Sequence, residues 1–337
     1  MATTSIRDVA RLAGVSVGTV SNVLNKPDGV SSDSVIRVQK AIEQLGYVRN
    51  DAARRLRAGV SSTVGFVVLD GQNPFFNEVV RGAEDEASKN GIAILLGNTD
   101  EDYHREGLYL DLFEEQRVRG VLISPHGDIT ARLKRLKSRD IPVVLVDRMN
   151  VEGEFSSVAV DSVVGGQIAA QHLIDTGRRH LAFVGGPFDI RQVRDRLEGA
   201  RVAVDNSDYD VDIEVVATNA LTVDEGVLAG RRLLERSRQL LPDAIFAAND
   251  LLALGVLQSL VAGGVRVPHE VSLIGFDDIA FAAAAAVPLS SVRQPSRMIG
   301  QTAFRILIEE ADDPDLIPRQ TVFRPELVVR QSTLPGA

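Results

Sequence analysis

Apolar residues recur at helical spacing in three short segments near the start of the chain, and this pattern predicts three short helices. Ser5 and Ser16 precede the first two as capping residues, and Gly14 provides the turn between them. The third helix ends at Gly46. The predicted buried faces are Ile6, Val9, Ala10 and Ala13, then Val20 and Val23, then Val35, Val38, Ile42 and Leu45.

The rest of the chain alternates short apolar runs with amphipathic stretches. The runs lie at 64–70, 92–98, 120–125, 141–147, 157–161, 180–186, 243–250 and 272–278, and helices such as 77–90 and 164–176 lie between most of them. Short continuous apolar runs are typical of parallel strands that are covered on both faces. We therefore expect a small all-α head followed by an α/β body with doubly wound parallel sheets, in which ligands bind beyond the carboxyl ends of the strands.

Length and composition limit the class of protein and the kinds of site that the chain can contain. The chain has 337 residues, of which 45% are hydrophobic and 25% charged, as expected for a globular protein of two or three structural units. Cysteine is absent, which excludes a disulfide framework and a thiolate metal site. The first residues contain neither an apolar signal core nor a run of membrane-spanning length, so we expect a cytoplasmic protein without a membrane partner.

Charge is distributed unevenly along the chain. Residues 1–60 carry nine Lys and Arg against five Asp and Glu, a net charge of +4, whereas the whole chain carries −9 and the remainder therefore −13. An acidic body would be repelled by a polyanion that a basic head attracts. The charge pattern predicts that only the head contacts a polyanion, although chance clustering in a short window would give the same numbers.

The second predicted helix leaves a slim and nearly uncharged face on its outer side. Two helices joined by a short turn with glycine, followed by a third, are typical of a helix-turn-helix unit whose second helix enters the major groove of DNA. Val17, Gly18 and Asn22 are therefore predicted to read base edges. The predicted phosphate or base-edge contacts are Ser5, Ser16, Thr19, Ser21 and Asn25. The alternative is a small three-helix interaction module.

Two stretches of the head, "IRDVARLAGVSVGTVSNVLN" and "GYVRNDAARRL", resemble the head of the lactose/galactose repressor (LacI) family. The resemblance implies a hinge helix over residues 50–58 that forms on operator DNA, with Leu56 as the minor-groove wedge at a central CG step. It also implies that Asn50, Ala53 and Arg54 take part in this DNA contact. Many relatives carry arginine where this chain has Asn22; asparagine suits adenine, so the outer operator sequence cannot be transferred from them.

The same resemblance implies the domain organisation. It gives a helix-turn-helix domain at 1–49, a hinge helix and linker at 50–63, and an effector-binding and dimerisation domain at 64–337. That last domain would resemble periplasmic sugar-binding proteins, with two subdomains and chain crossovers near Ser162, Val292 and Phe323.

Polar residues follow several of the predicted strands, where a ligand site is expected. Carboxylates, amides and a guanidinium that converge on one cleft suit a polyhydroxylated ligand, because each hydroxyl both donates and accepts. The resemblance favours binding over helix capping for Asp277 and Arg196, whereas Asp250 and Asp278 are predicted to be N-caps. The predicted effector-binding set is Asp70, Phe75, Phe76, Asp147, Arg148, Asp161, Gln192, Arg196, Leu221, Asn249 and Asp277.

Enzymatic signatures are missing from the sequence. The five histidines show no metal-ligand spacing, and neither a nucleophile elbow, a Walker loop nor a full dinucleotide fingerprint is present. We therefore expect no catalytic residue, no metal and no cofactor. Two alternatives remain open: a regulator controlled by a protein partner such as a phosphorylated carrier protein, and a sugar-processing enzyme fused to a DNA-binding head.

The prediction from sequence is a transcriptional repressor that binds double-stranded operator DNA and a sugar-like effector. One head reads only a half-site, so a homodimer on a pseudo-palindromic operator is expected. The last strand-like run, 325–330, ends at Arg330, and only seven residues follow it, two of them Pro335 and Gly336. That length cannot sustain a coiled coil, so we do not expect tetramers by that route.

Overall fold

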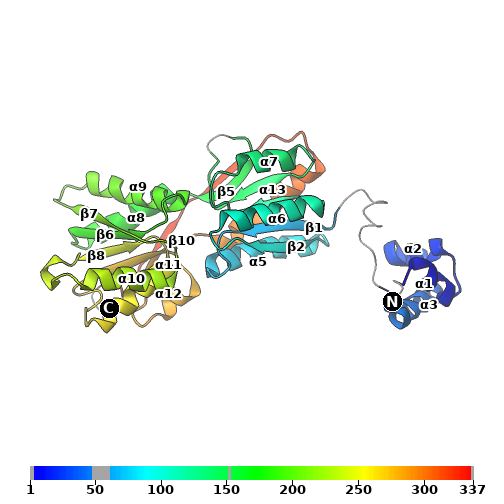
Figure 1. The fold of residues 1–337 in the computed structure, drawn as a ribbon, viewed down its shortest axis with the longest axis horizontal. Coiled ribbons are helices and arrows are strands. Elements are labelled where there is room, and N and C mark those ends of the chain that lie inside the picture. The colour runs from blue at the N-terminus through cyan, green and yellow to red at the C-terminus, as the bar shows by residue number, and fades with distance from the viewer. Residues whose placement is uncertain (1–3, 48–60, 151–152, 335–337) are drawn as a thin grey trace. The chain divides into compact units, whose positions relative to one another are not determined.

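The computed structural model describes residues 4–47, 61–150 and 153–334. The chain divides between Val60 and Ser61 into two compact units, which we call the head and the body (Figure 1). Among the described residues, no helix is both long and apolar enough to cross a membrane.

The head contains the three predicted helices, α1 (Ile6–Ala13), α2 (Val17–Asn25) and α3 (Ser32–Leu45), with a 3-10 turn at Pro27–Gly29. The Asp8 carboxylate accepts a hydrogen bond from the backbone of Ser5 at 3.0 Å and closes the first turn of α1. Gly14 and Gly46 end α1 and α3 with φ of 64° and 56°, in the left-handed region that glycine adopts without strain.

A small core holds the three helices of the head together. Val9, Val20 and Val38 come one from each helix and are fully buried. Arg37 on α3 donates to the carbonyl of Ala13 at 3.2 Å and fixes α3 against the end of α1. The predicted helix-turn-helix fold is confirmed, and one face of α2 is committed to the core.

The body contains two six-stranded sheets. The first belongs to the part we call the N-subdomain and has the order β11-β5-β4-β3-β1-β2, with every pair parallel. Its strands are β1 (Thr63–Val68), β2 (Ala93–Asn98), β3 (Val121–Ile123), β4 (Val143–Val146), β5 (Ser156–Val160) and β11 (Gln320–Phe323). Its helices are α5 (Pro74–Lys89), α6 (Tyr103–Glu115), α7 (Thr130–Lys137) and α13 (Ser296–Asp312).

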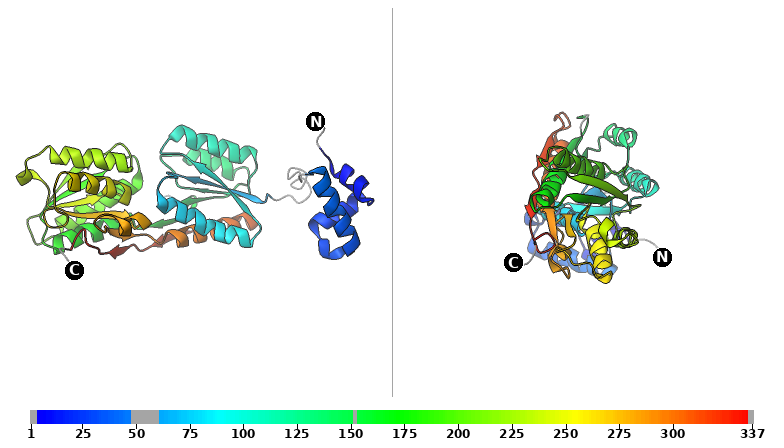
Figure 2. Two further views of the ribbon diagram at one scale, coloured as in Figure 1. Left: turned by 90° about the horizontal axis from the view of Figure 1, so that it is seen from below. Right: turned by 90° about the vertical axis from the view of Figure 1, so that its left-hand side faces the viewer.

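Alternation along β1 explains why both faces of this sheet are covered. Phe66 and Val68 pack into one apolar cluster together with side chains of α5 and α13, whereas Val67 packs into a second cluster with side chains of α6 and α7. Successive side chains of a strand point to opposite faces, so one apolar run serves two helical layers. Figure 2 shows these layers on the two sides of the sheet.

The second sheet belongs to the part we call the C-subdomain and has the order β12-β10-β9-β8-β6-β7. Only β12 runs antiparallel to its neighbour. Its strands are β6 (His180–Gly185), β7 (Asp212–Ala217), β8 (Ala244–Ala247), β9 (Ser272–Asp277), β10 (Ser290–Arg293) and β12 (Glu326–Val328). Its helices are α8 (Ser162–Asp175), α9 (Arg191–Asp205), α10 (Val223–Leu234), α11 (Asp250–Ala262) and the short α12 (Ala280–Ala284), and a 3-10 turn lies at Arg238–Leu240.

The chain passes between the two subdomains three times, after β5, after β10 and after β11 (Figure 1). The predicted α/β class with two doubly wound subdomains is confirmed. Three strands, β7, β10 and β11, were not predicted as strands, whereas β12 lies within the predicted strand-like run 325–330. β7 and β11 are sheet-edge strands with exposed residues and a polar pattern, and β10 has only four residues, so none of the three shows a long apolar run.

Two glycines let α8 and α9 pack closely in the C-subdomain. A Cβ atom added at Gly166 would lie 2.0 Å from the carbonyl oxygen of Arg196, and one added at Gly199 would lie 1.9 Å from that of Val163. No side chain fits at such distances without moving a helix. The two glycines therefore fix the position of α9, which carries side chains of the cleft described next.

Candidate functional sites

The outward face of α2 is the candidate DNA-contacting surface of the head. Val20 and Val23 are buried, whereas Val17, Gly18 and Asn22 are exposed. A Cβ atom at Gly18 would meet only ordinary contacts, the nearest being Ser16 Oγ at 3.5 Å. Packing within the head therefore does not require glycine at this position, whereas close approach of the backbone to a base edge would benefit from it.

The side chains of Ser16 and Thr19 are hydrogen-bonded to each other at the start of α2. Ser16 Oγ accepts from the backbone N–H of Thr19 at 3.0 Å, and the two hydroxyls lie 2.9 Å apart. This bond caps the helix and aligns both hydroxyls on its exposed end. Ser5 is exposed and Ser21 is half-buried. The side chain of Asn25 and the hinge positions Asn50, Ala53, Arg54 and Leu56 lie outside the described residues.

A cleft between the two subdomains holds the second candidate site. Its floor is a cavity of about 20 Å³, which we call the inner compartment. The lining comes from strand ends, loops and the first turns of α5 and α9, all of which follow strands of the two sheets, as the strand-end rule predicts. The lining residues are Leu69, Asn73, Phe75, Phe76, Asp147, Ile190, Gln192, Arg196, Leu221, Asn249 and Asp277.

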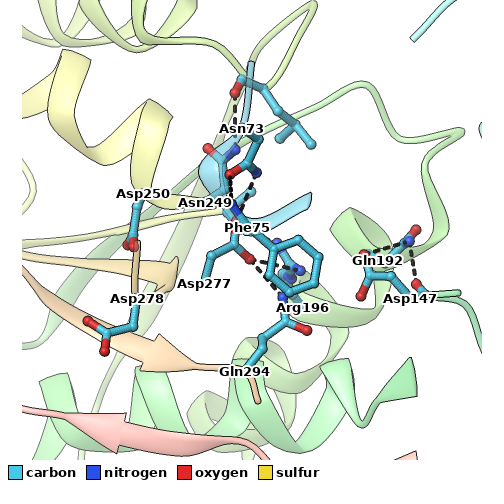
Figure 3. A network of polar contacts seen from close by, with 12 residues as sticks. Asn73, Phe75, Asp147, Gln192, Arg196, Asn249, Asp250, Asp277, Asp278 and Gln294 are labelled. Carbon is cyan, nitrogen blue, oxygen red and sulfur yellow. Dashed lines mark hydrogen bonds and ion pairs between the residues drawn. The ribbon is translucent and has the colours of Figure 1, made fainter. Parts of the chain in front are cut away.

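Asp277 is the centre of a polar network that joins the subdomains (Figure 3). One carboxylate oxygen accepts from Asn73 Nδ2 of the N-subdomain at 3.0 Å, and the other accepts from Gln294 Nε2 at 2.8 Å. The guanidinium of Arg196 lies 3.6 Å from the second oxygen. Burial raises the pKa of Asp277, and Arg196, Asn73 and Gln294 oppose that rise.

Arg196 is held in place by its neighbours. It is 4% exposed, donates to the carbonyl of Ala248 at 2.6 Å and stacks on the ring of Phe276 with 3.8 Å between the guanidinium carbon and the ring centre. A guanidinium fixed by stacking and by a backbone bond is oriented for recognition. Its Nε atom and Gln294 Oε1 are buried and have no hydrogen-bond partner among the described residues.

Asp147 and Gln192 form a second bridge across the cleft. Gln192 Nε2 of the C-subdomain donates to Asp147 Oδ2 of the N-subdomain at 3.2 Å and also to the Asp147 carbonyl. Burial, followed by the nearby charge of Asp277, raises the pKa of Asp147 to about 7, although Arg196 and Gln192 act against it. Asp147 and Asp277 have φ of 56° and 102°, a conformation that is costly for residues other than glycine.

The remaining lining residues shape the compartment. Asn249 caps α11 through its Oδ1 atom, which accepts from Leu252 at 2.9 Å, and its Nδ2 atom donates to the carbonyl of Leu221 at 3.0 Å. Phe75 and Phe76 are buried and meet edge to face with 5.1 Å between ring centres. The inner compartment thus combines apolar walls with carboxylates, amides and one guanidinium.

Three predicted effector residues do not line the inner compartment. Asp161 caps α8 and accepts from Val164 at 3.0 Å, so its carboxylate satisfies the helix end. Asp70 accepts from the backbone of Gln72 at 2.7 Å in a local turn. Arg148 lines a different cavity. The other eight predicted residues all line the inner compartment, and their contact with an effector stays a prediction.

Sequence reasoning missed Asn73 and Gln294, which hold the two oxygens of Asp277. Asn73 was recognisable in the sequence as a helix cap, because it directly precedes Pro74. In the structure its Oδ1 atom accepts from the backbone N–H of Phe75 at 3.0 Å. Gln294 follows β10, a strand that was not predicted. Leu69 and Ile190, the other missed lining residues, are ordinary core residues in the sequence.

The prediction that Asp250 and Asp278 cap helices is wrong. Asn249 is the N-cap of α11, and the buried Asp250 carboxylate instead accepts from Ser291 Oγ at 2.7 Å and from the backbone of Ile279 at 2.8 Å. Asp278 pairs with Arg293 and Arg330, each at 2.7 Å. Both carboxylates tie loops at the end of the second sheet together. No cluster of His, Asp and Glu that could hold a metal occurs among the described residues.

Comparison with known proteins gives two family matches. Residues 5–50 match the bacterial regulatory proteins of the lacI family, and residues 170–333 match the periplasmic binding protein-like domain. The first match covers the described helices of the head, and the second covers most of the C-subdomain.

Named relatives match almost the entire chain. The HTH-type transcriptional repressor PurR of Vibrio campbellii is 35% identical over 97% of this chain and 98% of its own length. The ribose operon repressor of Escherichia coli is 34% identical over 97% of this chain and 99% of its own length. The solved structure of the transcriptional regulator CelR in complex with cellobiose is 32% identical, with a TM-score of 0.73 over 98% of this chain and 99% of its own.

Proposed function

The chain belongs to the LacI family of DNA-binding transcriptional repressors, and from this premise we propose that it binds a pseudo-palindromic operator as a homodimer and responds to a polyhydroxylated effector in the inner compartment. The names of its relatives support a regulator rather than an enzyme.

The head supports operator recognition by α2. Its outward face is slim, exposed and uncharged at Val17, Gly18 and Asn22, as a surface that approaches base edges requires. Asn22 favours adenine, because its amide both donates and accepts at the major-groove edge of that base. One head covers a half-site, so two heads on a symmetric operator are needed for useful affinity. Light scattering should give twice the chain mass of 36.4 kDa.

One observation supports the effector site more than any other: the buried pair of Arg196 and Asp277 lies in a cleft with unsatisfied polar atoms beside it. Arg196 Nε lacks an acceptor and Gln294 Oε1 lacks a donor. A hydroxyl group provides both, whereas a buried polar atom without a partner costs about 1–3 kcal/mol. The buried rings of Phe75 and Phe76 supply an apolar surface for the carbon face of a sugar ring.

Effector entry competes with contacts between the subdomains. At about 20 Å³ the inner compartment has room for roughly one water, so a sugar enters only when the subdomains separate. Ligand hydroxyls would then replace the bonds from Asn73 to Asp277 and from Gln192 to Asp147. The free and bound proteins would differ in closure, and a coupling of about 1–3 kcal/mol to operator affinity is typical of such systems.

Calorimetric titration of the full chain with pentoses, hexoses and disaccharides tests the effector site. We expect at least one of these sugars to bind, and Arg196→Ala to abolish that binding. Arg194→Ala is the matched control, because Arg194 lies on the same helix but is exposed and does not line the inner compartment.

Three results would contradict this proposal. If no sugar binds but a phosphorylated carrier protein changes operator affinity, the protein-partner alternative is correct. If a sugar is consumed during incubation with the protein, the enzymatic alternative is correct. A normal response to sugar in the Arg196→Ala protein would place the effector elsewhere.

A further inference from the structure

A larger cavity of about 500 Å³ lies beside the inner compartment, and we call it the outer compartment. It lies at the carboxyl ends of β3 and β4 and is completed by Arg191, the first residue of α9. Ile129, Leu133 and Phe155 form an apolar wall, and all three are buried. A volume of this size is within the range of pockets that bind small molecules.

Two pairs of consecutive residues connect the linings of the inner and outer compartments. Asp147 and Gln192 line the inner compartment, whereas Arg148 and Arg191, their immediate chain neighbours, line the outer one. The hydrogen bond of 3.2 Å between Gln192 and Asp147 therefore lies at the boundary. A ligand ring that replaces this bond therefore has Arg148 and Arg191 as the chain neighbours of the residues that it contacts.

The polar groups of the outer compartment are balanced in charge. Arg148 and Arg191 supply donors, and Asp128 and Glu154 supply carboxylate acceptors. Glu154 pairs with Lys134 through Oε1 at 2.9 Å, whereas its Oε2 atom is buried, has no hydrogen-bond partner among the described residues and can accept from a ligand. A hydroxyl group can donate to it, whereas a fully ionised phosphate has no donor and is repelled by it. Matched charges, an unsatisfied acceptor and an apolar wall favour a neutral, hydroxylated ring over an anion.

We propose that the outer compartment binds the second glycosyl unit of a disaccharide effector whose first ring occupies the inner compartment. This inference rests on the proposed effector site and adds the size class of the ligand. The half-buried Arg148 already donates to the carbonyl of Gly127, which holds it at the wall, and Arg191 pairs with Asp195 at 3.5 Å. Both guanidinium groups retain further N–H groups for ligand hydroxyls.

The test compares sugars that differ by one ring. The full chain is titrated calorimetrically with glucose, cellobiose and maltose, with galactose, lactose and melibiose, and with glucose 6-phosphate. We expect one disaccharide to bind at least about tenfold more tightly than its own monosaccharide, since hydrogen bonds to charged groups are worth about that factor or more. Arg191→Ala should reduce this advantage, and Arg191→Trp, which fills the compartment, should abolish it.

Arg194→Ala is the matched control for these variants, because it removes the same side chain one turn along α9 and should leave the advantage of the disaccharide intact. Equal affinities for mono- and disaccharide, or equal losses for both in Arg191→Ala, would overturn the inference while leaving the proposed effector site standing. Tightest binding of glucose 6-phosphate would also overturn it, in favour of an anion subsite. If no sugar of either size binds, the proposed effector site fails and this inference fails with it.

Discussion

The outer face of α2 and the inner compartment of the cleft are opposite kinds of site. On α2, Val17, Gly18 and Asn22 face solvent. In the cleft, Asp277 and Arg196 are buried and bound to the protein's own groups. The exposed face of α2 can bind a partner without breaking contacts of its own. The cleft must first exchange its internal hydrogen bonds for hydrogen bonds to a ligand.

This difference suits the two regions to different functions. A preformed surface loses little conformational entropy when it binds, so it suits recognition of one fixed target. A cleft that has two bonding arrangements is suited to switching, because a ligand can shift a population only between states that it binds differently. Variants that affect one region should leave the other unchanged, and the following predictions test that separation, starting with the largest effect.

Arg196→Ala should have the largest effect, and it should be confined to the body. Removing one partner of a buried ion pair leaves the Asp277 charge uncompensated and typically costs about 3–5 kcal/mol. Calorimetry should show a drop of several degrees in the melting temperature of the body, with the transition of the head unmoved. A shift of both transitions would show that the two units unfold together.

Val38→Ala should destabilise the head by about 2–3 kcal/mol, since Val38 is fully buried between the three helices and two methyl groups and their contacts are lost. Ile36→Ala on the same helix is the control, because Ile36 is 53% exposed and its loss should change stability by less than about 0.5 kcal/mol. Sugar affinity of the body should be the same in both variants. Equal destabilisation by the two would contradict the assigned core.

Asn22→Ala should weaken operator binding by about 1–3 kcal/mol and relax the preference at one base pair, because a two-point contact with a base is lost. Binding of DNA of unrelated sequence should be unaffected, and so should sugar affinity. Gln39→Ala on the exposed side of α3 is the control. The measurement is fluorescence anisotropy against a set of single-base operator variants, and an unchanged preference would exclude Asn22 as a base reader.

The cleft should make the free energy of unfolding of the body depend on pH by about 1 kcal/mol. The folded pKa of Asp147 is raised to about 7, so the penalty for its ionisation is absent below the unfolded pKa and is complete above pH 7. When the pH is lowered from 8 to 6, the body should therefore gain about 1 kcal/mol of stability, or about 2–4 °C in melting temperature. Burial raises the pKa of Glu101 to about 7 as well, so that residue contributes with the same sign.

Asp147→Asn isolates the contribution of Asp147, because the amide keeps the size of the side chain and does not ionise. The variant should lose that part of the pH dependence which Asp147 causes and keep the part due to Glu101. An identical pH profile for the variant and the parent protein would show that Asp147 is ionised or hydrated in the folded protein.

Local spacing was enough to predict the head and its outer face. Once Val20 and Val23 are assigned to the core, the period of the helix puts Val17, Gly18 and Asn22 outside, and Ser16 marks the start. No distant residue is needed for that argument. The hinge positions from Asn50 to Leu56 rest on the family resemblance alone and lie outside the described residues.

The cleft was only partly predictable, because its residues converge from distant parts of the chain. The strand-end rule found Asp147, Asn249 and Asp277, but it treated Asp161 in the same way, and only the structure shows that Asp161 caps a helix. Gln294 was missed together with the short strand before it. A one-dimensional pattern indicates which residues end a strand; it does not indicate which strand ends face each other.

The central claim is that the cleft and the operator-binding face are coupled through a ligand that the cleft binds. The direct measurement is the operator Kd with and without saturating sugar, together with the sugar Kd with and without operator DNA. The two ratios must be equal if they report one coupling free energy, and we expect a factor of about 5–150. A sugar that binds in the cleft and leaves operator affinity unchanged would contradict the account.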